Sequence, residues 1–90
     1  MKRSKLRILM DILFLIQDKE GKAKPTHILY GANLSHSSLK EYLNSLISNG
    51  FIEEVKENQH TFYRLTEKGY SYINDLRKVE KLTDAFGISV

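Results

Sequence analysis

Residues 35–49, SHSSLKEYLNSLISN, constrain the fold of this chain more than any other stretch. Their apolar side chains recur at helical spacing, at Leu39, Tyr42, Leu43, Leu46 and Ile47. Ser35 is a favourable N-cap, and Gly50 ends the run. The pattern predicts an amphipathic helix with one buried face. A helix whose first turn is small and polar can enter a DNA major groove.

A shorter helix is predicted just before this one. Pro25 suits the first turn of a helix over residues 25–30. Gly31 can adopt the positive φ that ends a helix, so residues 31–33 are expected to form a turn. A short helix, a tight turn and a longer amphipathic helix make a helix-turn-helix.

The hydrophobic period changes after Gly50. Residues 51–56 (FIEEVK) and 61–65 (TFYRL) are short and rich in β-branched and aromatic side chains. They predict a β-hairpin with Ile52, Tyr63 and Leu65 facing the core. A hairpin directly after a helix-turn-helix is a wing.

Helices are also predicted towards both ends of the chain. Residues 5–18 predict a helix so apolar that more than one of its sides is expected to be covered, with a partner subunit as one candidate for the covering. A polar loop follows over residues 19–24. Thr66 caps a last helix that begins at Glu67, and its apolar residues show the a/d spacing of a coiled coil. Its second half, from about Val79, extends further than a small domain needs.

Composition limits the classes of protein that fit. Ninety residues make a single domain, which we divide into a winged helix-turn-helix core (residues 1–66) and a C-terminal helix (residues 67–90). The first 45 residues carry eight Lys and Arg against four Asp and Glu, a net charge of +4. The other 45 carry six against seven, a net charge of −1. This asymmetry fits a polyanion partner or a solvated surface.

Several functions have no support in the sequence. The apolar run near the N-terminus is interrupted by Asp11 and is too short to span a membrane. There are no cysteines, and His27, His36 and His60 lack the spacing of a metal site. There is no glycine-rich phosphate loop and no nucleophile–base constellation. We therefore expect neither an enzyme nor a cofactor, and no small-molecule ligand is evident.

Two segments resemble a known family. Residues 28–52 (ILYGANLSHSSLKEYLNSLISNGFI) and residues 63–69 (YRLTEKG) are similar to the archaeal winged helix-turn-helix DNA-binding proteins of the ArnR-like type. The matching positions are Asn33, Leu34, Ser35, Tyr42, Leu43, Leu46 and Gly50, then Tyr63, Leu65, Thr66, Lys68 and Gly69 of the signature Y-x-L-T-x-K-G. That family includes small crenarchaeal and viral regulators and dimeric chromatin-associated proteins. The resemblance implies an α+β, mostly α fold: a winged helix-turn-helix with a C-terminal dimerisation helix.

The resemblance and the helical pattern together suggest residues that contact DNA. The helix over residues 35–49 would direct five polar side chains to the groove: Ser35, His36, Ser37, Lys40 and Asn44. Pro25 stands where the family often has a Lys-Thr pair, so the phosphate contact falls to Lys24 or Thr26. The candidates in the wing are Arg64, Lys56 and His60, although the nearby glutamates make the wing locally acidic. The alternative is that this helix face is simply solvated and lies beside a surface that binds another protein.

Other residues suggest how the N-terminus and a partner subunit take part. Four basic side chains near the N-terminus could reach phosphates as an arm or merely solvate the first helix: Lys2, Arg3, Lys5 and Arg7. Six apolar side chains are candidates for a dimer seam, and core packing accounts for some of them: Phe14, Tyr72, Leu76, Val79, Leu82 and Phe86.

The leading hypothesis is a homodimeric, sequence-specific regulator of transcription that binds double-stranded DNA, located on the nucleoid in the cytoplasm. An architectural chromatin protein without sequence preference is one alternative. A winged-helix module that binds other proteins is the second.

Overall fold

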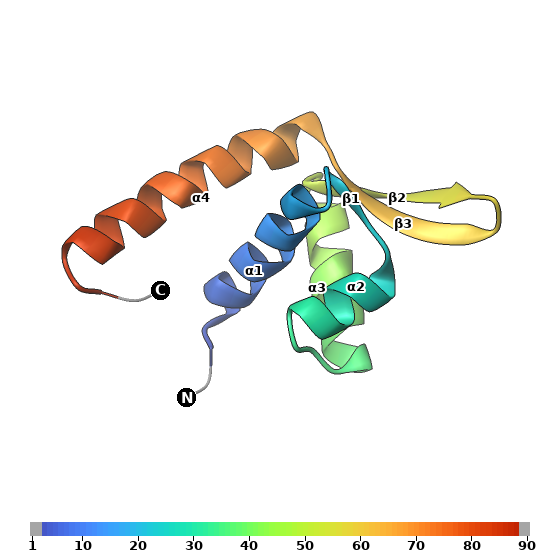
Figure 1. Cartoon of the computed structure of the whole chain (residues 1–90), viewed down its shortest axis with the longest axis horizontal. Coiled ribbons are helices and arrows are strands. Elements are labelled where there is room, and N and C mark those ends of the chain that lie inside the picture. The colour runs from blue at the N-terminus through green and yellow to red at the C-terminus, as the bar shows by residue number, and fades with distance from the viewer. Residues whose placement is uncertain (1–2, 89–90) are drawn as a thin grey trace.

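The computed structural model describes residues 3–88, which form four helices and a three-stranded sheet (Figure 1). The helices are α1 (Lys5–Asp18), α2 (Pro25–Gly31), α3 (His36–Ser48) and α4 (Glu67–Ala85). The strands are β1 (Lys22–Ala23), β2 (Ile52–Glu57) and β3 (His60–Leu65). The expected fold class, mostly helical with a small antiparallel sheet behind a helix-turn-helix, is confirmed.

Three of these helices begin at a side-chain hydroxyl that accepts a hydrogen bond from a backbone amide. The pairs, hydroxyl first, are Ser4 with Arg7, Ser35 with Ser38, and Thr66 with Gly69. Such caps satisfy amides that have no partner within the helix. Ser35 and Thr66 are the caps that the sequence predicts, so α3 and α4 begin where expected.

The sheet contains one strand that the sequence analysis assigned to a loop. β2 and β3 form the expected antiparallel hairpin, in which Ile52 lies opposite Leu65. β1 pairs with the other edge of β3 and brings Lys22 opposite Arg64. Two residues are too few to show an alternating pattern, so the expectation of a loop over residues 19–24 was wrong at this strand.

The core is built around α1. Its side chains at Met10, Ile12, Leu13 and Ile16 are completely buried. α1 packs against α2, α4, β1 and β3, so elements of the same chain cover most of its wide apolar surface. The buried side of α3 is the predicted one, formed by Leu39, Leu43 and Leu46.

α4 belongs to the core only over its first half. Ile73 and Leu76 are buried, and no later residue of this helix is. Figure 1 shows α4 extending away from the core, on the side opposite to the tip of the β2–β3 hairpin. The chain is accordingly elongated, with principal extents of 46 × 28 × 21 Å.

None of the helices described, from α1 to α4, combines the length and hydropathy needed to cross a lipid bilayer.

Candidate nucleic-acid interface

The outward face of α3 is polar and exposed. Successive residues of a helix are rotated by roughly 100°, which places Ser37, Glu41 and Asn44 opposite the buried leucines and Lys40 on one flank. All four side chains are exposed. Within residues 3–88, Lys40, Glu41 and Asn44 form no side-chain hydrogen bond and no ion pair in the protein. Their donors and acceptors are therefore available to an external partner.

The first turn of α3 divides the predicted residues into two groups. The Ser35 hydroxyl accepts from the Ser38 amide at 3.2 Å and donates to the Ser38 hydroxyl at 3.0 Å. Ser35 thus acts first as the helix cap. His36 and Ser37 are exposed on the turn that follows.

Lys24 and Thr26 lie at the start of α2, and both are exposed. Lys24 is the N-cap residue of α2 and caps it without a side-chain hydrogen bond. Its amine lies 5.9 Å from the centre of the Phe62 ring, so Lys24 is next to the hairpin as well as the helix-turn-helix. This position is compatible with the predicted phosphate contact.

Cations of the wing are paired with its glutamates. The Arg64 Nε donates to the Glu53 carboxylate at 2.9 Å, and the Lys22 amine donates to Glu57 at 2.8 Å. The hydrogen bond from Lys22 lowers the pKa of the Glu57 carboxyl below its ordinary value. Burial raises the pKa of the Tyr63 hydroxyl in the same hairpin. Arg64 must leave Glu53 or share it in order to contact DNA.

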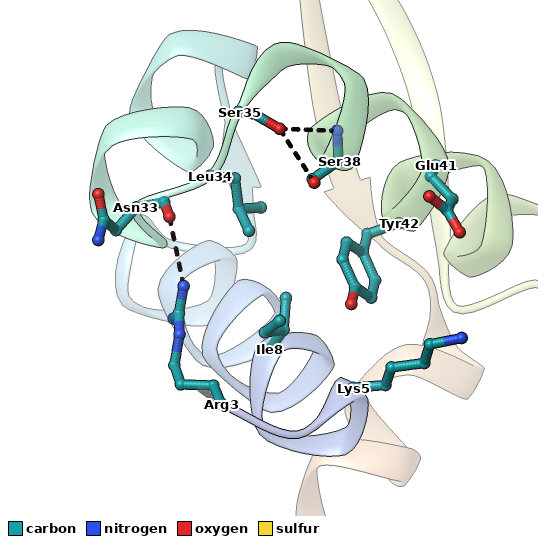
Figure 2. Close-up of a pocket in the computed structure, with 9 residues that line it drawn as sticks. All are labelled: Arg3, Lys5, Ile8, Asn33, Leu34, Ser35, Ser38, Glu41 and Tyr42. Atoms are coloured by element: carbon teal, nitrogen blue, oxygen red, sulfur yellow. Dashed lines mark hydrogen bonds between the residues drawn. The ribbon is translucent and has the colours of Figure 1, made fainter. Parts of the chain in front are cut away.

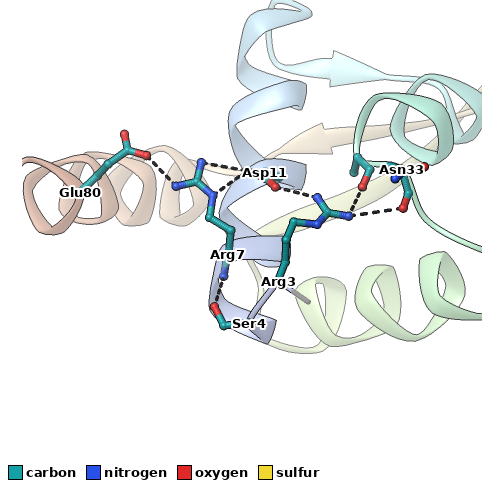
Figure 3. A network of polar contacts seen from close by, with 7 residues as sticks. Arg3, Ser4, Arg7, Asp11, Asn33 and Glu80 are labelled. Atoms are coloured by element: carbon teal, nitrogen blue, oxygen red, sulfur yellow. Dashed lines mark hydrogen bonds and ion pairs between the residues drawn. The ribbon is translucent and has the colours of Figure 1, made fainter. Parts of the chain in front are cut away.

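Two of the basic residues near the N-terminus, Arg3 and Arg7, form ion pairs within the protein (Figure 3). Arg3 donates to Asp11 at 2.8 Å, and Arg7 donates to both Asp11 and Glu80. The hydrogen bond to Glu80 is the main reason that the pKa of Arg7 is raised above its ordinary value. Arg3 and Arg7 therefore do not form a free arm, and Lys2 lies outside the described residues.

A hollow of about 460 Å³ separates the start of α1 from the flank of α3. Figure 2 shows Ile8, Leu34 and Tyr42 directed toward one another across it. Lys5 lies at its edge, is exposed, and forms no ion pair among the described residues. Lys5 is thus a described basic residue near the N-terminus that remains available beside α3.

The C-terminal end of α3 is held by the start of α4. The Thr66 hydroxyl donates to the Gly50 carbonyl at 2.5 Å, and the Phe51 carbonyl accepts from the Thr66 amide at 3.1 Å. Gly69 lies against the same Phe51 carbonyl, where a Cβ atom would come within 2.1 Å of the oxygen. Only glycine fits this close approach.

Lys68 completes this junction. Its amine donates to the Asn49 carbonyl at 2.7 Å and lies 5.0 Å from the centre of the Phe51 ring. A cation near the last carbonyls of a helix is electrostatically favourable. Thr66, Lys68 and Gly69, which the family signature singles out, therefore all contact the corner that follows α3.

The six residues predicted for a dimer seam lie in two different environments. Leu76 is buried in the core, Tyr72 stacks on Phe51 with ring centroids 4.2 Å apart, and Phe14 carries the Arg77 guanidinium on its ring. The remaining three, on the second half of α4 and at its C-cap, are exposed: Val79, Leu82 and Phe86. Contacts within the chain account for the first group, so the second group is the better candidate for a partner surface.

No cluster of three metal-ligating side chains occurs among residues 3–88.

Known proteins resemble this chain over most of its length. The sequence profile of a family described as "Winged helix-turn-helix" matches residues 2–84. The uncharacterized protein MJ0287 of Methanocaldococcus jannaschii is 40% identical over 81 residues, which cover 87% of this chain and 77% of that protein.

Two solved structures resemble the fold closely. Sso10a-2, described as a DNA-binding protein from Sulfolobus solfataricus, has a TM-score of 0.81 and 27% identity, over 93% of this chain and 85% of that one. F93 from STIV, described as a winged-helix DNA-binding protein, has a TM-score of 0.75 over 89% of this chain and 92% of that one. Its identity of 19% makes it a likeness of fold alone.

Proposed function

The chain belongs to the winged helix-turn-helix family, and from that premise we propose that it binds specific sites on double-stranded DNA as a homodimer and regulates transcription. α3 enters the major groove in each half-site. The observation that carries the proposal is the outward face of α3, where Lys40 and Asn44 are exposed and have no partner among the described residues. Such a protein acts on the nucleoid in the cytoplasm.

The side chains on this face can distinguish bases. Lysine donates to the O6 and N7 acceptors of guanine, and asparagine forms a bidentate pair with adenine. Glu41 repels phosphates but can accept from the amine of cytosine. A face that mixes cation, amide and carboxylate favours sequence recognition over the uniform basic surface of an architectural protein.

The source of the remaining affinity is phosphate contact. Lys24 and Thr26 at the start of α2, and Lys5 beside the hollow, are the side chains we assign to it. Sso10a-2 and F93 are described as DNA-binding proteins, and this supports DNA as the partner. The wing adds little positive charge, because Glu57 neutralises Lys22 and Glu53 neutralises Arg64.

We assign dimerisation to the second half of α4. Leu82 and Phe86 are 61% and 77% exposed, and Val79 lies on the same side of the helix. Large apolar side chains this exposed, in a row, are typical of an interaction surface. A second copy of the same helix offers a complementary apolar row.

Leu82→Glu is expected to convert the dimer into monomers, because a carboxylate on the apolar row loses its water without gaining a partner. Light scattering at several protein concentrations measures the change. Lys81→Glu, which places the same side chain on the neighbouring residue away from this row, should remain dimeric. A wild-type protein that is already monomeric at high concentration contradicts the dimer.

The DNA-binding proposal is tested by selecting bound duplexes from a random pool and repeating the binding at about 50 and 200 mM salt. We expect the selected duplex to bind at least roughly a thousandfold more tightly than a random duplex of equal length. A steep salt dependence without preference would indicate an architectural protein instead. Absence of binding even at the lower salt would indicate a protein-interaction module.

A further inference from the structure

A continuous network of ion pairs and hydrogen bonds joins α4 to the turn that precedes α3 (Figure 3). Glu80 of α4 accepts from Arg7 at 2.9 Å, and Arg7 also donates to one oxygen of Asp11 at 3.0 Å. The other oxygen of Asp11 accepts from Arg3 at 2.8 Å. The network of ion pairs therefore crosses α1 from one side to the other.

Arg3 links this network to the helix-turn-helix. Its second terminal nitrogen donates to the Ala32 carbonyl at 2.5 Å and to the Asn33 carbonyl at 3.4 Å. These carbonyls lie in the turn between α2 and α3, where Asn33 has a positive φ of 53°. The turn fixes where Ser35 begins α3, so Arg3 contacts the segment that orients the helix.

At the other end, Glu80 lies where α4 has left the core. Leu76 is the last buried residue of this helix. Beyond it, polar and cation–π contacts with α1 come from Arg77, which meets Gln17 and the Phe14 ring, and from Glu80. Glu80 thus makes the contact farthest along α4 from the core. Of these contacts, it constrains the direction of the free end of α4 most strongly.

The four side chains are partly shielded from solvent. Their exposed fractions lie between 25% and 33%. Pairs in such positions are screened less by salt than fully exposed pairs, and the shared Asp11 makes them a network. A network of this kind holds a geometry better than isolated surface pairs do.

We propose that the Arg7–Glu80 pair, acting through Asp11 and Arg3, sets the angle between α4 and the helix-turn-helix and thereby the half-site spacing that the dimer accepts. This inference rests on the proposed function, since α4 joins the two subunits there. Glu80 and Arg7 are positioning residues that determine specificity without touching DNA.

Half-site spacing is sensitive to this angle. One base pair added between half-sites moves the second site by about 3.4 Å and rotates it by roughly 34°. A dimer with a fixed angle between α4 and α3 matches one spacing. A dimer in which the angle between α4 and α3 can vary is able to bind half-sites at several spacings, with little preference among them.

The experiment compares wild type with Glu80→Ala on the duplex selected by the wild type, and on versions with one base pair added or removed at the centre. We expect wild-type affinity to fall roughly tenfold or more on the altered duplexes. Glu80→Ala is expected to bind all three within about threefold of one another. A Glu80→Ala protein with the spacing preference of the wild type overturns the inference.

Two further variants separate geometry from charge. Asp84→Ala also removes a carboxylate from α4, but Asp84 has no ion partner among the described residues and should keep the wild-type preference. Arg7→Lys keeps the positive charge, yet a lysine lacks the planar fork that bridges Asp11 and Glu80. It should reproduce the loss of spacing preference, and if it does not, bridging by Arg7 is not the cause.

A readout without DNA distinguishes this inference from the proposed function. The amides of Ala32, Asn33 and Leu34 donate to carbonyls of α2. We therefore expect them to be protected from hydrogen exchange in the wild type. In Glu80→Ala we expect them to exchange about threefold faster, and in Asp84→Ala at the wild-type rate. Unchanged exchange in Glu80→Ala contradicts the coupling even where DNA binding is intact. Absence of DNA binding by the wild type instead contradicts the proposed function.

Discussion

Lys40→Ala and Asn44→Ala are each expected to weaken binding to the selected duplex by about tenfold or more, while the melting temperature stays within a few degrees of wild type. A side chain that pairs with a base edge contributes roughly 1–3 kcal/mol of discrimination. Both side chains are exposed and form no side-chain hydrogen bond or ion pair with the described residues, so their removal costs little stability. Fluorescence anisotropy with labelled duplex measures the affinity, and thermal denaturation measures the stability.

Matched substitutions on α4 serve as controls for these two variants. Lys78→Ala removes an equal charge and Asn74→Ala an equal amide, from exposed positions on a different helix. They should leave the affinity within about twofold of wild type, apart from a small change in salt dependence with Lys78→Ala. If Lys40→Ala and Asn44→Ala bind as tightly as these controls, the outward face of α3 is not the groove-reading surface.

Gly69→Ala is expected to lower the free energy of unfolding by about 2 kcal/mol and the melting temperature by roughly 10 °C. The added Cβ would come within 2.1 Å of the Phe51 carbonyl oxygen, a backbone atom that cannot rotate away. That oxygen also accepts a hydrogen bond from the Thr66 amide. Moving the Phe51 carbonyl away from the new Cβ would therefore strain the junction between α3 and α4. The gain of roughly 1 kcal/mol from replacing glycine in a helix offsets only part of this cost.

Gly31→Ala is the control for Gly69→Ala, because it creates an equally close contact with a movable atom. Its Cβ would meet the end of the Leu15 side chain at 2.0 Å, and that methyl group can turn aside. We expect the melting temperature to change by less than about 5 °C. Equal losses in both variants would show that the rigid Phe51 carbonyl is not the cause.

Much of this fold could be predicted because its signals are local. Ser35 and Thr66 cap their helices within three residues, and the leucines of α3 repeat with the helical period. The change to alternating strands after Gly50 is equally local. The winged helix-turn-helix resemblance rested on the same segments, and the family profile over residues 2–84 confirms it.

Charged side chains were harder to interpret from the sequence. The basic residues near the N-terminus suggested an arm for phosphates, yet Arg3 and Arg7 bind Asp11 and Glu80. Arg7 and Glu80 are 73 positions apart. Nothing in the spacing of either residue indicates the other, because an ion pair across the fold leaves no periodic trace.

The sequence by itself determined the order of the helices, the hairpin and the polar face of α3, since helix caps, turns and hydrophobic period act over a few residues. Only the tertiary structure decided which charges remain available, because each pair depends on elements brought together by the core. It also decided that Leu76 is buried while Phe86 is exposed, although both fit one coiled-coil spacing. The reason is physical: the core ends at Leu76, and α4 continues past it.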